Sequence, residues 1–140
     1  MTKKINASIF LLFIIVLLLP SCDKDNFNKK LGKYAIAVKY KGHEALKLQF
    51  FIDGKESGKL QLVTTSRPSP VNDCKDLRKP GELINVFVAK DVPVGKHQLE
   101  IRTEEGILLE TLDFLMYDKE CVFQEVNIQI SKMKRPASLF

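Results

Sequence analysis

The sequence predicts an all-β fold, a single antiparallel β-sandwich of about seven strands that occupies residues 34–131. Three observations lead to this prediction. From residue 34 onward, apolar and polar side chains alternate with a period of two, which is typical of strands with one buried face. Turn-forming residues recur at short intervals between these segments. No segment after the N-terminal apolar run has helical periodicity, and this combination favours a sandwich.

Seven segments carry the alternation, and a turn or loop separates each from the next. The predicted strands cover residues 34–40, 46–52, 60–64, 84–89, 98–103, 108–114 and 122–130. Asp53 with Gly54, and the segment 104–106, are turn signals between neighbouring strands. The segment 90–96, KDVPVGK, is a further predicted turn. The predicted mature chain, residues 22–140, is long enough for one domain with a modest core and too short for two.

Residues 1–22 have the layout of a secretion signal. Two lysines give a positive start, residues 9–19 form an unbroken apolar run, and the chain becomes polar directly after Cys22. As a helix this run would rise only about 16 Å, whereas a bilayer core is roughly 30 Å thick and needs about 20 apolar residues. The run therefore favours a cleaved signal, and the alternative is an uncleaved anchor.

The last residues of this segment, Leu19-Pro20-Ser21-Cys22, resemble a bacterial lipobox, in which the signal is removed just before a cysteine that has received a lipid. The resemblance implies a signal peptide at residues 1–21 and a lipid on Cys22. It also implies a Gram-negative lipoprotein in the outer membrane of the cell envelope, facing the periplasm or the surface. Pro20 departs from the pattern, which more often has Ala, Ser, Thr, Val or Ile there. Each buried CH₂ of a lipid contributes about 0.8 kcal/mol, so two or more chains hold a protein firmly.

Charged segments flank the predicted domain. Residues 22–33 are interpreted as a lipidated cysteine with a flexible tether, and residues 132–140 as a basic tail. The acidic residues just after Cys22 resemble the surface-export signals of lipoproteins in some Gram-negative phyla, and the alternative is a solvated linker. The chain has 22 Lys+Arg and 17 Asp+Glu; without two lysines of the signal and three basic residues of the tail, 17 of each sign remain. A neutral domain argues against nucleic acid as a partner.

The chain has three cysteines. With Cys22 assigned to the lipid, Cys74 and Cys121 remain, and in an oxidising compartment they predict a disulfide. The alternative is two separate buried thiols. In the chain-entropy model a disulfide that closes so long a loop stabilises the fold by about 4 kcal/mol.

The segment 65–83 is the longest irregular part of the predicted domain. Its prolines remove backbone donors, so it cannot be a central strand. A connection of this length in a compact domain is usually functional or disordered, and here prolines and a cysteine restrict it. A restricted loop loses less entropy on binding, so we expect it to bind a partner through Arg67, Arg78 and Lys79. The alternative is a cover over a sheet edge or over Phe51.

Phe50 and Phe51 are neighbours on one predicted strand, so they face opposite sides of the sheet. Either both faces are covered, or Phe51 is exposed for contact with a partner. The chain has no tryptophan, and carbohydrate-binding modules rely heavily on exposed aromatic platforms. Carbohydrate binding is therefore not favoured.

No sequence pattern for catalysis or for metal binding occurs. His43 and His97 are the only histidines, no serine lies in G-x-S-x-G, and neither C-x-x-C nor H-x-x-x-H is present. The segment 53–56 superficially resembles a calcium loop, but Lys55 takes a ligand position and excludes an EF-hand. We therefore expect no enzymatic activity, no catalytic residue, no cofactor and no metal, and both histidines are interpreted as ordinary turn or strand-end residues.

Residues 92–101 contain Pro93, Gly95 and then His-x-Leu, and they resemble the turn and strand of Ig-like and transthyretin-like extracellular modules. The resemblance carries no catalytic residue across. The leading hypothesis is an envelope or surface lipoprotein whose sandwich binds another macromolecule, in assembly, adhesion or toxin neutralisation. An inhibitor or enzyme accessory domain, and a lipoprotein that binds a small ligand or glycan, are the alternatives.

Overall fold

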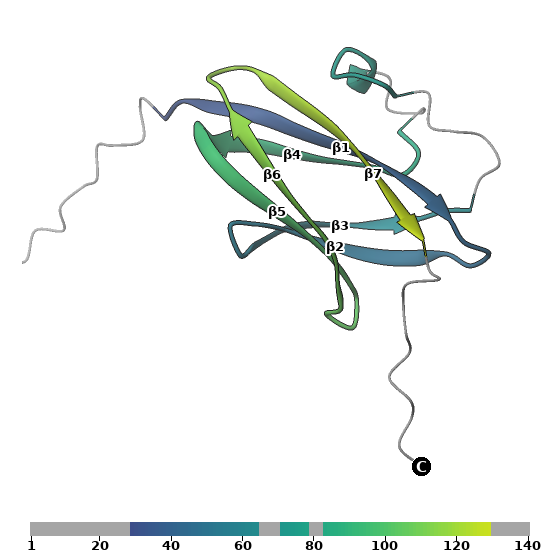
Figure 1. Ribbon diagram of the computed structural model, residues 1–140. Coiled ribbons are helices and arrows are strands. Elements are labelled where there is room, and N and C mark those ends of the chain that lie inside the picture. Colours follow the sequence, from purple (N-terminus) through teal and green to yellow (C-terminus); the bar gives the residue numbers. More distant parts are fainter. Residues whose placement is uncertain (1–28, 65–70, 79–82, 130–140) are drawn as a thin grey trace, which may run out of the picture.

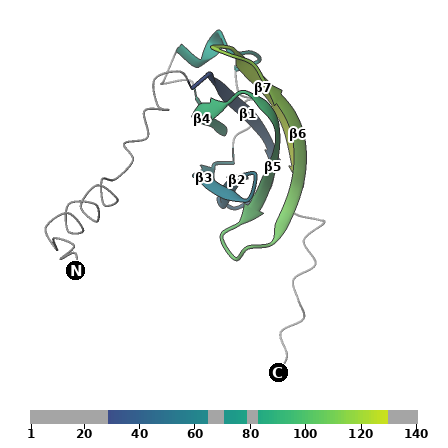
Figure 2. The same cartoon turned by 90° about the vertical axis from the view of Figure 1, so that its left-hand side faces the viewer.

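A computed structural model describes residues 29–64, 71–78 and 83–129 as a β-sandwich (Figure 1). Its strands are β1 (Leu31–Lys41), β2 (Leu46–Ile52), β3 (Lys55–Leu62), β4 (Val86–Pro93), β5 (Gly95–Thr103), β6 (Leu108–Met116) and β7 (Cys121–Gln129), with a 3₁₀ turn η2 (Asp76–Arg78) before β4. One sheet has the order β4-β1-β7 and the other β3-β2-β5-β6. The sheets face each other with β3 beside β4 at one margin and β6 beside β7 at the other (Figure 2). The predicted all-β sandwich is confirmed.

One pairing departs from the purely antiparallel arrangement that the sequence predicts. β1 and β7 run parallel, from Lys33 opposite Cys121 to Lys41 opposite Gln129, whereas the other pairings in the described chain are antiparallel. Local alternation identifies a strand but not its direction relative to a distant partner, so this pairing was not visible in the sequence. Because β1 and β7 are parallel, the described chain begins and ends at opposite ends of the sandwich (Figure 1).

Several strand boundaries also differ from the prediction. β1 begins at Leu31, inside the expected tether, because its first residues pair with the end of β4. β3 begins at Lys55, since Asp53 and Gly54 form a two-residue turn in which both φ angles are positive. The predicted turn at 90–96 is shorter, because β4 and β5 occupy most of it.

Aromatic contacts join the two sheets through the core. Phe50 of β2 stacks on Phe87 of β4, and Tyr34 of β1 stacks on Phe114 of β6, each with ring centroids 4.1 Å apart. Such pairs contribute about 0.5–1.5 kcal/mol beyond their burial. Gly58 of β3 leaves room for this packing, because a Cβ at that position would lie 2.7 Å from a ring carbon of Phe87. The two stacks therefore hold the sheets in register with each other.

A second, smaller apolar cluster lies on the outer face of the three-stranded sheet. Ala37 of β1 and Val86 of β4 are buried there against Val71, which is itself only 1% exposed. Partly buried side chains surround them: Leu77, Leu83, Val88 and Phe123. The predicted disulfide is confirmed, since Cys74 is bonded to Cys121 at the first residue of β7. The η2 segment is thus fastened over this sheet, on the side away from β2 and β3 (Figure 1).

Candidate functional site

The loop that the sequence singles out for binding is described at residues 71–78. Its backbone is held by Asp76, whose carboxylate accepts hydrogen bonds from the amides of Asn72 at 2.9 Å and Asp73 at 3.3 Å. A second carboxylate, that of Asp73, accepts a hydrogen bond from the amide of Lys75 at 2.6 Å. Together with Val71 and the disulfide, these bonds fix the loop both internally and against the sheet.

The three basic residues proposed for binding are only partly placed. Arg78 is exposed at the end of η2. Arg67 and Lys79 lie outside the described residues, as does Cys22. The described part of the loop covers the outer face of the three-stranded sheet, where it packs on the edge strands β4 and β7 as well as on β1. It does not cover Phe51, which lies in the other sheet.

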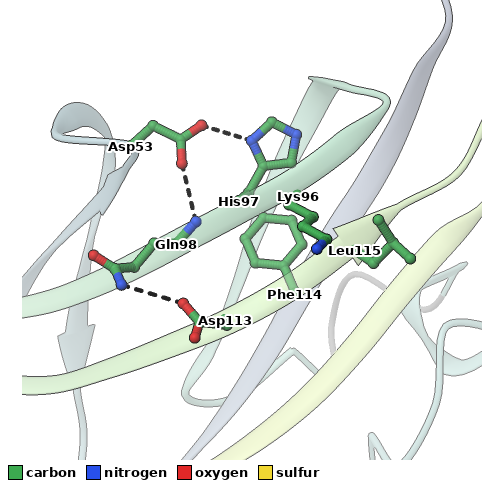
Figure 3. Close-up of a pocket in the computed structure, with 7 residues that line it drawn as sticks. All are labelled: Asp53, Lys96, His97, Gln98, Asp113, Phe114 and Leu115. Carbon is green, nitrogen blue, oxygen red and sulfur yellow. Dashed lines mark hydrogen bonds and ion pairs between the residues drawn. The ribbon is translucent and has the colours of Figure 1, made fainter.

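The second candidate site centres on His97, near the start of β5. Its Nδ1 lies 2.6 Å from a carboxylate oxygen of Asp53, and its Nε2 lies 2.6 Å from the backbone oxygen of Pro93. Both neighbours are acceptors, so the ring donates to both only as a doubly protonated cation. The other carboxylate oxygen of Asp53 accepts the amide of Gln98 at 2.9 Å, as Figure 3 shows. The interaction joins the β2–β3 turn, the end of β4 and β5.

Effects of opposite sign act on the pKa of His97. Partial burial lowers it because burial disfavours the cation, whereas the hydrogen bonds to Asp53 and Pro93 raise it, and the net shift of the pKa is upward. The hydrogen bond from His97, followed by that from the amide of Gln98, holds the pKa of Asp53 below its usual value. The side chain of His97 is 9% exposed and that of Asp53 is 50% exposed, so water still screens the pair.

The hydrogen bonds of His97 to Asp53 and Pro93 suit a structural role, and we call these three residues the His97 clamp. While both hydrogen bonds persist, the imidazolium has no lone pair with which to accept a proton from a substrate. Two open hollows flank the clamp, one of about 610 Å³ that includes Lys96, Phe114 and Leu115 (Figure 3), and one of about 790 Å³ between the β2–β3 turn and β4. Both linings mix acidic, basic and apolar side chains, so neither favours one class of ligand.

His97 was interpreted as an ordinary strand-end residue, and its contact with Asp53 was not predicted. Two signals were visible, an aspartate at the first position of a predicted Asp-Gly turn and a histidine two residues after Gly95. The sequence did not show that these two residues, which are 44 positions apart, come into contact. His43, by contrast, is exposed in the connection between β1 and β2, where an ordinary turn residue was expected.

Phe51 has a cover of its own. Phe50 is fully buried, whereas Phe51 is partly buried on the outer face of the four-stranded sheet. The guanidinium carbon of Arg102 lies 5.1 Å from the centroid of the Phe51 ring, within the range of a cation–π contact. Glu100 accepts a hydrogen bond from Nε of Arg102 at 3.0 Å and orients it. A neighbouring side chain therefore covers Phe51, and the described part of the loop does not.

In the ranges 29–64, 71–78 and 83–129, no group of three or more His, Cys, Asp or Glu residues is arranged to hold a metal ion. Within these ranges there is also no helix with the length and apolar character needed to cross a membrane. No protein-family model matches the chain, and a comparison with curated proteins finds no match.

Proposed function

We propose that this chain is a lipoprotein of the cell envelope, attached to the outer membrane through a lipid on Cys22, whose sandwich binds another macromolecule. The address rests on the sequence of residues 1–22 and its resemblance to a lipobox signal. The partner is an envelope or extracellular protein, met in assembly, adhesion or toxin neutralisation. The acidic residues after Cys22 favour display at the surface over the periplasmic side.

The fastened loop at 71–78 is the observation that supports binding. The disulfide, the buried Val71 and the bonds to Asp76 restrict the loop before any partner arrives. A surface ordered in advance loses less conformational entropy on association, so more of the contact energy remains as affinity. Arg78 is exposed on this surface, and Arg67 and Lys79 belong to the same connection between β3 and β4.

The strand order favours one of the two resemblances over the other. In immunoglobulin constant domains, the first, second, fifth and fourth strands share one sheet, and the third, sixth and seventh share the other. Here the first strand lies between the fourth and seventh, and the second lies between the third and fifth. This strand order does not support the Ig-like resemblance, and the transthyretin-like resemblance stays part of our proposal.

The anchor is tested by growing cells that express the full chain with a labelled fatty acid. The label is expected on the protein and is expected to be absent from the Cys22→Ala chain. Label that persists after this substitution contradicts the proposed attachment site.

Binding is tested by capture of partners from envelope extract with the full chain. Replacing Arg67, Arg78 and Lys79 together by alanine is expected to weaken capture while the melting temperature stays unchanged. The matched control replaces three basic residues of the four-stranded sheet, Lys47, Lys55 and Lys59, and is expected to leave capture intact. Equal capture by both variants and the parent chain would place the binding surface elsewhere.

A further inference from the structure

A patch of exposed apolar side chains lies at the end of the sandwich where the chain enters β1. Its members are Val94, Leu115 and Tyr117, which are 43%, 41% and 50% exposed. Valine, leucine and tyrosine side chains exposed together on a small domain indicate a contact surface more than isolated exposed residues do. We call these three residues, with Lys30, Lys96 and Lys119, the entry patch.

The pairing of the strands brings the entry patch together. Lys96 of β5 pairs with Leu115 of β6, and Figure 3 shows their side chains beside each other. Gly95 pairs with Met116, so the residues that flank this pair, Val94 and Tyr117, are neighbours at the end of the same ladder.

The first residues of β1 close the patch from the other side. The amide of Val94 donates to the backbone oxygen of Lys30 at 3.1 Å, and the amide of Lys119 donates to that of Leu31 at 2.8 Å. Gly32 lies so close that a Cβ there would be 2.7 Å from the backbone oxygen of Tyr117. The tether therefore joins the domain inside the patch, not beside it.

The charge around the patch is positive. Six exposed lysines lie at this end, none of them in an ion pair with another described residue: Lys29, Lys30, Lys33, Lys90, Lys96 and Lys119. The acidic residues at this end are fewer. Asp91, Asp118 and Glu120 lie in the same turns and strand ends, and Asp53 and Asp113 lie beside Lys96 and Leu115 (Figure 3), with Asp53 paired to His97. An apolar centre with a tyrosine and a surplus of lysines matches the interface of a bilayer with anionic headgroups, where tyrosine rings concentrate and lysines gain electrostatic attraction.

We propose that the entry patch rests on the lipid surface to which the chain is anchored, with its apolar side chains among anionic headgroups. The inference rests on the proposed lipid at Cys22. From Cys22 to Leu31 the chain can span at most about 30 Å, so the anchor keeps this end of the domain close to the bilayer. Tethering raises the effective concentration of the patch at the surface, so three side chains suffice for a contact that would be weak in free solution.

The absence of tryptophan from the chain permits a direct test. The full chain with Tyr117→Trp is reconstituted in phosphatidylethanolamine vesicles that contain phosphatidylglycerol and a lipid brominated near its headgroup. The matched control is Leu108→Trp, because Leu108 is 52% exposed at the opposite end of β6. We expect blue-shifted emission and severalfold stronger quenching in the Tyr117→Trp chain than in the control. Since the Debye length falls from about 10 Å at 0.1 M salt to about 3 Å at 1 M, the quenching should weaken with added salt.

Equal quenching in the two chains, or none in the Tyr117→Trp chain, overturns the inference. Val94→Trp gives an independent reading if Tyr117→Trp destabilises the turn. Co-sedimentation of the same samples tests the anchor separately. A chain that sediments with the vesicles but is not quenched supports the proposed lipid and contradicts the proposed contact of the entry patch. A chain that does not sediment contradicts both the proposed lipid and the proposed contact of the entry patch. Replacing Lys30, Lys96 and Lys119 by glutamine should reduce the quenching without releasing the protein from the vesicles.

Discussion

The two outer faces of the sandwich differ in what covers them. On the three-stranded sheet, the outward residues Ala35 and Ala37 of β1 are 0% and 3% exposed, because the disulfide-bonded loop lies on that face. On the four-stranded sheet, the outward residues Gln49, Glu100 and Arg102 keep contact with water. Small outward side chains leave space for a second layer, whereas long charged ones remain hydrated. Substitutions should therefore cost much more on the covered face than on the face that is bare in the described chain.

The largest expected effect is the loss of the bond that fastens the cover. Replacing Cys74 and Cys121 together by alanine should lower the free energy of unfolding by about 4 kcal/mol, because the unfolded chain regains the freedom of a long loop. Urea unfolding followed by circular dichroism measures it. A loss below about 1 kcal/mol would mean that apolar contacts alone hold the loop, and the covered face would then owe little to the disulfide.

The next effect compares one apolar residue from each face. Val71→Ala removes two methyl groups from a closed site and should cost about 2 kcal/mol. Phe51→Ala, beneath Arg102 on the bare face, should cost less than about 1 kcal/mol although the side chain is larger, because the ring already contacts water. The same unfolding measurement serves for both chains. Equal losses would remove the distinction between the faces.

The His97 clamp, which lies at neither outer face, should give a smaller effect that depends on pH. His97→Gln removes a charged hydrogen-bond donor and should cost about 1–2 kcal/mol at about pH 6. Because the folded pKa of His97 is raised above its usual 6.5, its contribution is complete below pH 6.5 and is lost as pH rises through the folded pKa. For Asp53 the folded pKa lies below the usual 3.8, so its contribution is present above pH 3.8 and is lost as pH falls through the folded pKa.

The stabilisation by this pair should therefore be greatest between pH 3.8 and 6.5, the usual pKa values of its two members. Unfolding free energies at a series of pH values measure the profile. His43→Gln is the matched control, since it removes an exposed histidine from the connection between β1 and β2. If the His97→Gln chain keeps the decline of the parent chain above neutral pH, another group causes that decline.

The smallest expected effect concerns the C-terminal tail. Truncation after Ser131 removes the basic segment 132–140, which follows the last predicted strand and lies outside the described residues. The melting temperature should stay nearly unchanged, because Pro136 resists continuation of the last predicted strand into the tail. A clear drop in the melting temperature would mean that the tail docks onto the sandwich.

The sequence predicted those features that depend on neighbouring residues. Alternation located the strands, and the reasoning from an oxidising compartment paired Cys74 with Cys121 correctly. Burial of β1 on both faces was not predicted, although the unbroken apolar run from Tyr34 to Val38 is a local sign of it. The sequence could not show which segment covers the outer face, because that segment lies more than thirty residues away along the chain. The same limit hid the parallel β1–β7 pairing and the bond from His97 to Asp53. Long-range contacts are set by packing, and a local pattern carries no sign of them.

The pairing of Lys33 with Cys121 has a mechanical consequence. A pull that arrives through the proposed N-terminal anchor acts along β1. Against a load at the far end of the sandwich, it loads the hydrogen bonds of β1 to β4 and β7 in shear, so that many bonds resist at once. A partner held by the loop would pull instead on Cys74, whose covalent bond passes the force to Cys121, directly opposite the start of β1. The path between anchor and partner then crosses only the first rungs of this ladder and one disulfide. The rest of the sandwich does not lie on this path, so its core carries little of the force when the anchor and the partner are pulled apart.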